Sequence, residues 1–261
     1  MPTRFALTNA EIEFDDMGVG APILLLHGFP ATRWLWSRVA PQLAKRAYRV
    51  LVPDLIGYGS SVSAPGTRLD MLSQAGWMWE LLDALQIQQA FIVAHDVGSA
   101  AAQLMVVASP ERVRGLVLLD GVWGSEWAMD AVESIRVWNP VEAHRLPAVL
   151  MRRLGKSEHM RAMLTAYAGE SGGRRLIAAA RDLDPQQTAS IGPALQECKV
   201  PSLVLWGRND RFLDADAVGR PLADLLDAPL RLLPGGHFIP SDCPEEVTSA
   251  VCDFVSVVER E

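Results

Sequence analysis

The sequence predicts an α/β domain built on a mostly parallel central sheet, flanked by helices and carrying an inserted helical cap. Short runs of apolar, β-type residues alternate with longer stretches of helical periodicity, which is the pattern of a parallel sheet with right-handed crossovers. Several of the runs are apolar at every position, as strands buried on both faces are. The alternation lapses over residues 122–196, where helical segments rich in Ala, Leu, Met and Arg follow one another. We therefore expect residues 1–121 and 197–261 to form the core domain and residues 122–196 to form the cap.

The predicted elements alternate regularly outside the cap. The run around residues 11–14 is typical of a half-buried strand, and residues 15–20 have the composition of a turn that closes a hairpin. Buried strands are predicted at residues 23–26, 49–52, 91–94, 115–119, 202–206 and 230–233, and helices at residues 34–46, 69–85, 97–109, 215–226 and 244–258.

Composition excludes several classes of partner. The chain has 261 residues, 49% of them apolar and 21% charged, which is ordinary for a globular protein. A net charge of −7 without a basic run argues against nucleic acid as a partner. No run of 18 apolar residues and no signal-peptide core is found, so we expect a cytoplasmic protein that does not bind membranes. Three cysteines without metal-ligand spacing fit a reducing compartment, and neither a metal nor a cofactor is expected.

A nucleophile elbow is predicted where the strand at residues 91–94 meets the following helix. In the general motif, G-x-S-x-G, a sharp turn lifts the middle side chain above the sheet. Ala94 and Gly98 supply the small residues that this turn needs, but the middle residue is Asp96. A carboxylate is ionised without help from a base and can attack an electrophilic carbon to form an ester with the enzyme. The alternative is that Asp96 only caps the helix that follows.

The residues after the later strands supply partners for Asp96. Ligands of parallel sheets bind beyond the carboxyl ends of the strands. His237 lies there, in a loop with two preceding glycines, and we expect it to act as a general base toward water. Asp210 is the expected acid that orients His237, with Asp120, at the end of the preceding strand, as the alternative. The amides of Phe29 and Val97 are the expected oxyanion donors.

Four motifs resemble those of the α/β-hydrolase superfamily, in particular its Asp-nucleophile branch of epoxide hydrolases, haloalkane dehalogenases and fluoroacetate dehalogenases. They occupy residues 27–30 (HGFP), 54–61 (DLIGYGSS), 95–98 (HDVG) and 235–238 (GGHF). The resemblance implies an α/β-hydrolase fold and a cofactor-free enzyme acting on a small apolar organic substrate and water. Asp96 would form an alkyl ester, and water activated by His237 would hydrolyse it.

Departures from the two dehalogenase subfamilies favour an epoxide as the substrate. Haloalkane dehalogenases usually have a halide-binding Trp after the nucleophile, where this chain has Val97. Fluoroacetate dehalogenases have arginines just after the nucleophile, where this chain has Val97 and Ala100. Epoxide hydrolases usually use two cap tyrosines to bind the epoxide oxygen, and the predicted cap contains one, Tyr167.

The remaining expectations concern the pocket and the rival functions. The residues expected to contact the substrate are His27, Trp36, Trp123, Trp127, Tyr167 and Phe238. The first alternative is a haloalkane dehalogenase in which Trp36 or a cap tryptophan holds the halide. The others are a non-hydrolytic biosynthetic enzyme that uses Asp96 and His237 as acid and base, and a catalytically silent ligand-binding protein.

Overall fold

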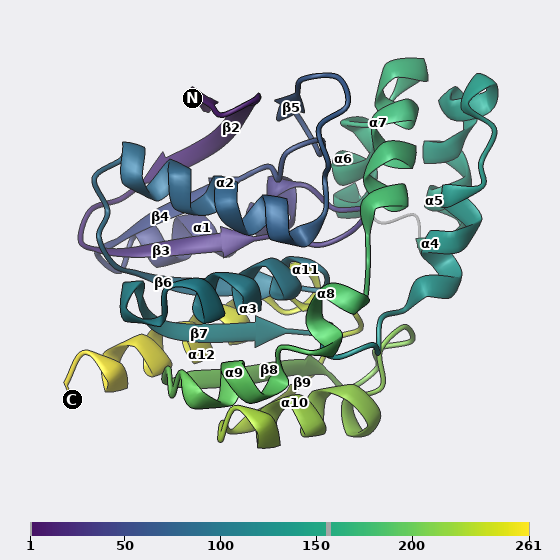
Figure 1. The fold of residues 1–261 in the computed structure, drawn as a ribbon. Helices are drawn as coiled ribbons and strands as arrows, with labels where there is room; N and C mark the ends of the chain where they lie inside the picture. Colours follow the sequence, from purple (N-terminus) through teal and green to yellow (C-terminus); the bar gives the residue numbers. More distant parts are fainter. Residues whose placement is uncertain (1, 155–157, 261) are drawn as a thin grey trace.

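The computed structural model describes residues 2–154 and 158–260. Within these residues one sheet forms the centre, with strand order β1-β2-β4-β3-β6-β7-β8-β9 (Figure 1). The strands are β1 (Thr3–Leu7), β2 (Ala10–Met17), β3 (Ala21–Leu26), β4 (Tyr48–Pro53), β6 (Ala90–His95), β7 (Val113–Leu119), β8 (Ser202–Gly207) and β9 (Leu230–Leu233). The short β5 (Val62–Ser63) pairs with β2. Every neighbouring pair from β4 to β9 is parallel. The predicted mostly parallel sheet is confirmed.

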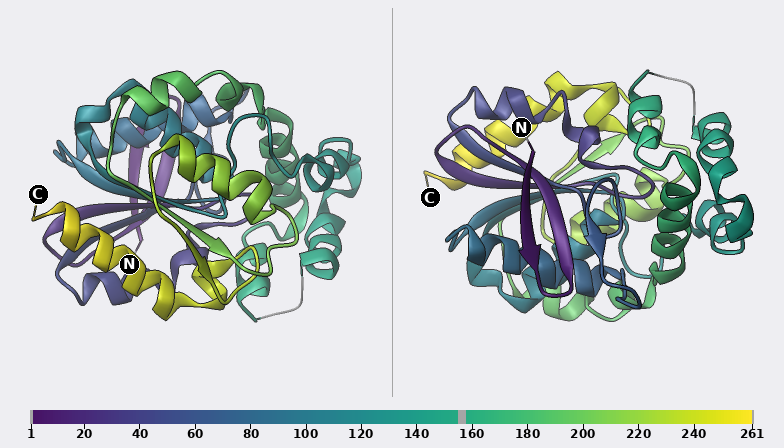
Figure 2. Two further views of the ribbon diagram at one scale, coloured as in Figure 1. Left: turned by 90° about the horizontal axis from the view of Figure 1, so that it is seen from below. Right: turned by 90° about the horizontal axis from the view of Figure 1, so that it is seen from above.

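Helices cover both faces of the sheet (Figure 2). On one face, α2 (Met71–Ala84) packs on α3 (Gly98–Ala108), and α8 (Gln186–Ala189) and α9 (Gly192–Glu197) also contact α3. On the other face lie α1 (Ala40–Ala44) and α12 (Pro244–Val258), which contact each other. The shorter α10 (Arg220–Leu225) packs on β8, and α11 (Ile239–Asp242) packs on α12. Strands β6 and β8 are fully buried between these layers, as their apolar sequences require, and β3 and β7 are mostly buried.

The cap stands at the carboxyl ends of the parallel strands (Figures 1 and 2). It contains α4 (Met129–Arg136), the 3-10 segment η3 (Pro140–Arg145), α5 (Leu146–Leu154), α6 (Glu158–Thr165) and α7 (Gly169–Asp182). The stretch predicted as cap, residues 122–196, therefore has two parts. Helices α4 to α7 stand over the sheet edge, whereas α8 and most of α9 belong by their packing to the core layer on α3.

The prediction of a hairpin turn at residues 15–20 is wrong for residues 15–17, which belong to a strand. Asp15 and Asp16 lie inside β2, which pairs antiparallel with β4 and with β1, not with β3. Asp16 is accommodated in the strand because its carboxylate bonds to Arg49 of β4 at 2.7 Å. Composition alone could not reveal this partner across the sheet.

The helix expected at residues 34–46 is divided into a 3-10 helix, η1 (Arg33–Trp36), and the short α1. Pro41 stands in the first turn of α1. A proline is accepted there because it needs no intrahelical hydrogen bond from its nitrogen, but it would break a continuous helix. The interruption turns the chain just after the loop that borders the site.

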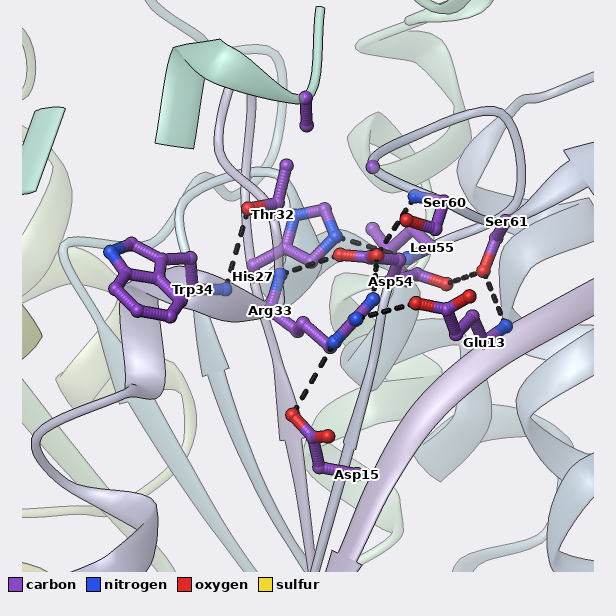
Figure 3. Close-up of polar contacts among 12 residues, drawn as sticks. Glu13, Asp15, His27, Thr32, Arg33, Trp34, Asp54, Leu55, Ser60 and Ser61 are labelled. Carbon is purple, nitrogen blue, oxygen red and sulfur yellow. Dashed lines mark hydrogen bonds and ion pairs between the residues drawn. The ribbon is translucent and has the colours of Figure 1, made fainter. Parts of the chain in front are cut away.

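Arg33, at the start of η1, lies among three carboxylates (Figure 3). It bonds to Glu13 of β2 at 2.5 Å, to Asp15 at 3.3 Å, and to Asp54 in the loop after β4. Asp54 is only 2% exposed and also accepts hydrogen bonds from the amides of Arg33 and Ser60. This network joins β2 to the two loops that follow β3 and β4, and so stiffens one border of the site.

We predict that Arg33→Ala destabilises the fold by about 3–5 kcal/mol, because it leaves the Asp54 carboxylate buried without its cation. The matched control is Arg49→Ala, which removes a solvent-accessible pair with Asp16 and should cost about 0–1 kcal/mol. Urea unfolding at pH 7 measures both. Equal, small losses would show that the Arg33 network contributes no more than a surface ion pair.

Candidate active site

Asp96 occupies the sharp turn between β6 and α3. Its φ of 51° lies in the left-handed region, which L residues other than Asn and Asp seldom adopt. The turn is held by the Asp96 carbonyl, which accepts from the Ser99 amide at 2.9 Å and from its hydroxyl at 2.5 Å. A Cβ on Gly98 would approach the His27 carbonyl oxygen to 2.4 Å, so no larger residue fits at that position. Asp96, the predicted nucleophile, therefore has a strained backbone conformation that the surrounding structure holds in place.

The Asp96 carboxylate is held by backbone amides from two loops. Its Oδ2 accepts from the Phe29 amide at 2.8 Å, and the Val97 amide also bonds to the carboxylate. The N-cap residue of α3 is Val97, without a side-chain capping bond, so the structure does not favour the capping role considered for Asp96. Both predicted oxyanion donors thus surround Asp96, and Oδ1 remains directed toward His237.

His237 stands between two carboxylates. Its Nδ1 donates to Asp210 Oδ2 at 2.8 Å, and its Nε2 is 3.8 Å from Asp96 Oδ1. Asp210 is itself fixed, because its Oδ1 accepts from the amides of Phe212 and Leu213. The three residues predicted as nucleophile, acid and base are therefore brought together at the carboxyl edge of the sheet.

Asp120, the alternative acid, is placed differently. Its Oδ1 accepts from the Gly207 amide at 2.6 Å, and no hydrogen bond or ion pair joins it to His237 in the described part of the chain. Its Oδ2 is buried and has no hydrogen-bond partner among the described residues. Burial raises the pKa of Asp120 well above its usual range. The geometry thus favours Asp210 over Asp120 as the group that orients His237.

The buried charges control the protonation of His237. Burial lowers the pKa of His237, but the hydrogen bond to Asp210 and the charges of Asp96, Asp210 and Asp120 outweigh it and raise that pKa to about 9. Burial raises the pKa of Asp96, against the charge of His237 and the amides of Phe29 and Val97. The raised pKa of His237 favours the imidazolium form of its ring near neutral pH. Because the pKa of His237 is raised on folding, the pairing of this ring with the carboxylates stabilises the fold fully below pH 6.5 and is lost as the pH rises through about 9.

His95 is a further site residue, to which the sequence assigned no catalytic role. Its Nε2 donates to the backbone carbonyl of His237 at 2.7 Å, and the two rings lie 5.0 Å apart. Burial lowers the pKa of His95 well below its usual value, so the ring is neutral. Its place next to the nucleophile was the only signal in the sequence. The ring supports the backbone from which the His237 side chain projects.

An apolar cavity is lined in part by Asp96 and His237. Of the residues expected to contact substrate, Trp127 and Phe238 line it, together with the oxyanion residues Phe29 and Val97. The sequence did not point to the rest of the wall, which is formed by Pro30, Val122, Ala128, Met129, Val132, Ile135, Leu150, Leu154 and Phe212. Such a wall suits an apolar ligand, because most of the described lining side chains are apolar.

Four residues expected to contact substrate do not line this cavity. The His27 Nδ1 bonds to the Gly28 carbonyl, and its Nε2 accepts from the Leu55 amide, which is the bond drawn in Figure 3. Burial lowers the pKa of His27 to about 4. Trp36 is fully buried in η1, and Trp123 lies beside Gly192 at the start of α9. None of these three side chains lines the cavity, so a contact with substrate stays a prediction for each of them.

Tyr167 is the fourth residue that was expected to contact substrate and does not line the cavity. Its hydroxyl donates to the Ala31 carbonyl at 2.8 Å, which ties the cap to the loop after β3. Trp127, although it lines the cavity, donates its indole N–H to the Thr188 hydroxyl at 3.0 Å. Neither of these cap donors is thus directed at a leaving group beside Asp96.

Residues 2–154 and 158–260 contain neither a metal-binding cluster nor a helix that could span a membrane. No three His, Cys, Asp or Glu side chains gather there in a way that would hold a metal ion. No helix in that part of the chain combines the length and the apolar character needed to cross a bilayer.

We predict that Gly28→Ala impairs the site specifically. The added Cβ would lie 2.4 Å from Asp96 Oδ2, so the carboxylate must leave its amide partners. One lost oxyanion donor typically lowers kcat by about 10²–10³-fold. Gly76→Ala, in the exposed interior of α2 with open space around its Cβ, is the control, and should keep activity and gain about 0.5–1 kcal/mol of stability. Turnover of any accepted substrate, with unfolding curves for both variants, tests this; full activity in Gly28→Ala would contradict it.

The chain can now be compared with known proteins. Residues 21–157 match the family model described as alpha/beta hydrolase fold, which is more than half of the chain. A 2-hydroxy-6-oxononadienedioate/2-hydroxy-6-oxononatrienedioate hydrolase from Paraburkholderia xenovorans is 28% identical over 95% of this chain and 91% of its own length. The enzyme of the same name from Escherichia coli K12 is 29% identical, over 94% and 91%. The solved structure of a haloalkane dehalogenase from Bradyrhizobium elkani superposes with a TM-score of 0.83 at 24% identity, over 100% of this chain and 99% of the other. The chain therefore belongs to the alpha/beta hydrolase fold family.

Proposed function

We propose that this chain is a cofactor-free hydrolase that opens an epoxide of an apolar compound through an ester on Asp96. One observation carries the proposal. Asp96 lines an apolar cavity, its carboxylate bonds to the amides of Phe29 and Val97, and its Oδ1 is 3.8 Å from His237 Nε2. A carboxylate so placed can attack carbon, and its carbonyl oxygen is then already in the oxyanion site.

In the first step Asp96 Oδ1 attacks one epoxide carbon from the side opposite the C–O bond. That bond breaks, its electron pair goes to the ring oxygen, and the oxygen takes up one proton. The product is a hydroxyalkyl ester of Asp96. The negative charge on residue 96 disappears, and with it one of the charges that raise the pKa of His237.

In the second step neutral His237 removes a proton from water, and the resulting hydroxide attacks the ester carbonyl carbon. Negative charge then develops on Oδ2, which accepts from the Phe29 amide, and the Val97 amide also bonds to the carboxylate group of residue 96. Collapse of this intermediate expels the diol oxygen, which takes the proton of the newly formed carboxylic acid. Asp96 is again a carboxylate and His237 again an imidazolium.

The charges that line the cavity also indicate whether the substrate is charged. Among the described residues that line the cavity, His237 is the only cationic side chain, and it is already paired with Asp96 and Asp210. The named substrates of the relatives are dioates, whose two carboxylates would find no free cation among these described lining residues. The middle residue of the elbow also differs from the serine of the general motif. We therefore assign this chain an uncharged substrate.

A haloalkane is the second candidate substrate for the same Asp96 chemistry. The Bradyrhizobium elkani haloalkane dehalogenase has the same fold as this chain. Against it, the indole N–H of Trp127 is engaged by Thr188, and Trp36 does not reach the cavity. A departing halide would thus lack the indole donor that its subfamily uses.

A single turnover in ¹⁸O-water with enzyme in excess over 1,2-epoxyhexane tests the ester. We expect one ¹⁸O atom in the peptide that contains Asp96 and unlabelled diol, because water attacks the ester carbonyl and the diol oxygen comes from the epoxide and Asp96. His237→Gln should accumulate the ester, however slowly it forms, and Asp96→Ala should form none. Label in the diol alone would mean direct attack by water, and a product without added water would mean non-hydrolytic chemistry; either result sinks the proposal.

A further inference from the structure

An opening epoxide needs a proton, and the cavity wall contains few groups that could supply it. Of the side chains that line the cavity in residues 2–154 and 158–260, Asp96, His237 and Trp127 carry a polar atom able to bond strongly to an oxygen. Asp96 is the nucleophile, and the Trp127 N–H bonds to Thr188. Tyr167, the cap residue of the type that binds epoxide oxygens, bonds to the Ala31 carbonyl and does not line the cavity.

Unlike the N–H of Trp127 and the hydroxyl of Tyr167, the proton on His237 Nε2 points toward the reaction site. Nδ1 is held by Asp210 at 2.8 Å, so Nε2 must face Asp96 and the cavity. The 3.8 Å between Nε2 and Asp96 Oδ1 is longer than a hydrogen bond. The N–H is therefore not fully committed to Asp96, and a reacting group beside Oδ1 can share it.

We propose, as an extension of the function proposed above, that His237 is the general acid of ring opening as well as the base of ester hydrolysis. Its Nε2 proton passes to the ring oxygen through one water molecule as the Asp96–carbon bond forms. Because Asp96 attacks opposite the C–O bond, the ring oxygen lies on the far side of the attacked carbon from Nε2, which is 3.8 Å from Oδ1. A general acid can act through one water molecule, and such a molecule spans this separation.

The protons balance with this assignment. The resting site holds His237 as imidazolium and Asp96 as carboxylate. Ring opening breaks the C–O bond, forms the ester and moves the Nε2 proton to the oxygen, which leaves His237 neutral. A neutral imidazole is what the second step requires, so no proton needs to be exchanged with solvent between the steps.

The surroundings of His237 support its acid form in the resting enzyme. Asp96 faces it from the elbow, Asp210 from the loop after β8, and Asp120 from the end of β7, and all three charges raise the pKa of His237. His95 of β6 also faces the ring and is neutral. A halide leaving group would not use this proton, and His237 would then have to lose it to solvent before it could activate water. The site thus matches an epoxide better than a haloalkane.

The test measures the rate of ester formation itself, by quenching single turnovers of 1,2-epoxyhexane and determining the intact mass of the enzyme. At pH 7 the ester should form about 10²–10⁴-fold more slowly in His237→Gln than in the wild type. In the wild type this rate should fall as the pH rises through about 9, because the acid form of His237 is lost. The fall should be absent in His237→Gln, which has no imidazole to titrate.

The outcomes separate the two proposals. If His237→Gln forms the ester at the wild-type rate, His237 serves only as a base and the present inference is wrong, while the ester on Asp96 stands. A wild-type rate that stays constant through pH 9 overturns the inference in the same way, even if the variant does not fold. If the wild type forms no ester with the epoxide, the proposed function fails and the inference fails with it.

Discussion

The site depends on one electrostatic interaction, the attraction between the buried carboxylate of Asp96 and the imidazole of His237. Burial by itself would leave His237 neutral, and the surrounding carboxylates reverse that preference. The charge on residue 96 is also the one that nucleophilic attack removes. The same interaction therefore keeps His237 as an acid before the ester forms and allows it to act as a base afterwards. Asp210, fixed by two backbone amides, keeps the ring in one orientation through both states.

The fold supplies the positions that this interaction requires. Parallel strands bring Asp96, Asp120 and the loops with Asp210 and His237 to one edge of the sheet, over which the cap places an apolar wall. The backbone approaches very closely around the nucleophile, where Gly28 and Gly98 leave no space for a side chain. Hydrogen bonds to the Asp96 carbonyl hold a turn that few residues would adopt alone. The rigid border contributed by the Arg33 network lies just behind these loops.

The sequence predicted the core of this arrangement because its signals are local. A buried strand, a tight turn and a small-residue helix specify the elbow without knowledge of distant contacts, and strand order then places Asp210 and His237 near Asp96. The cap could not be predicted in the same way. Tyr167 and Trp127 have the residue types expected of leaving-group donors, but their polar atoms bond to Ala31 and Thr188, which are far from them in sequence. The composition of residues 15–20 indicates a turn for a similar reason, since Asp16 finds its partner Arg49 on another strand and Asp15 finds Arg33 in η1.

The protonation of His237 can be measured most directly by NMR titration of ¹⁵N-labelled imidazoles, which is tractable because the chain has five histidines. Wild-type His237 should titrate near pH 9. In Asp96→Asn, which keeps the size of the side chain but removes its charge, the pKa of His237 should move down. Titration near 6.5 in the wild type, or an identical pKa in both proteins, would contradict the coupling between residue 96 and His237 on which the account rests.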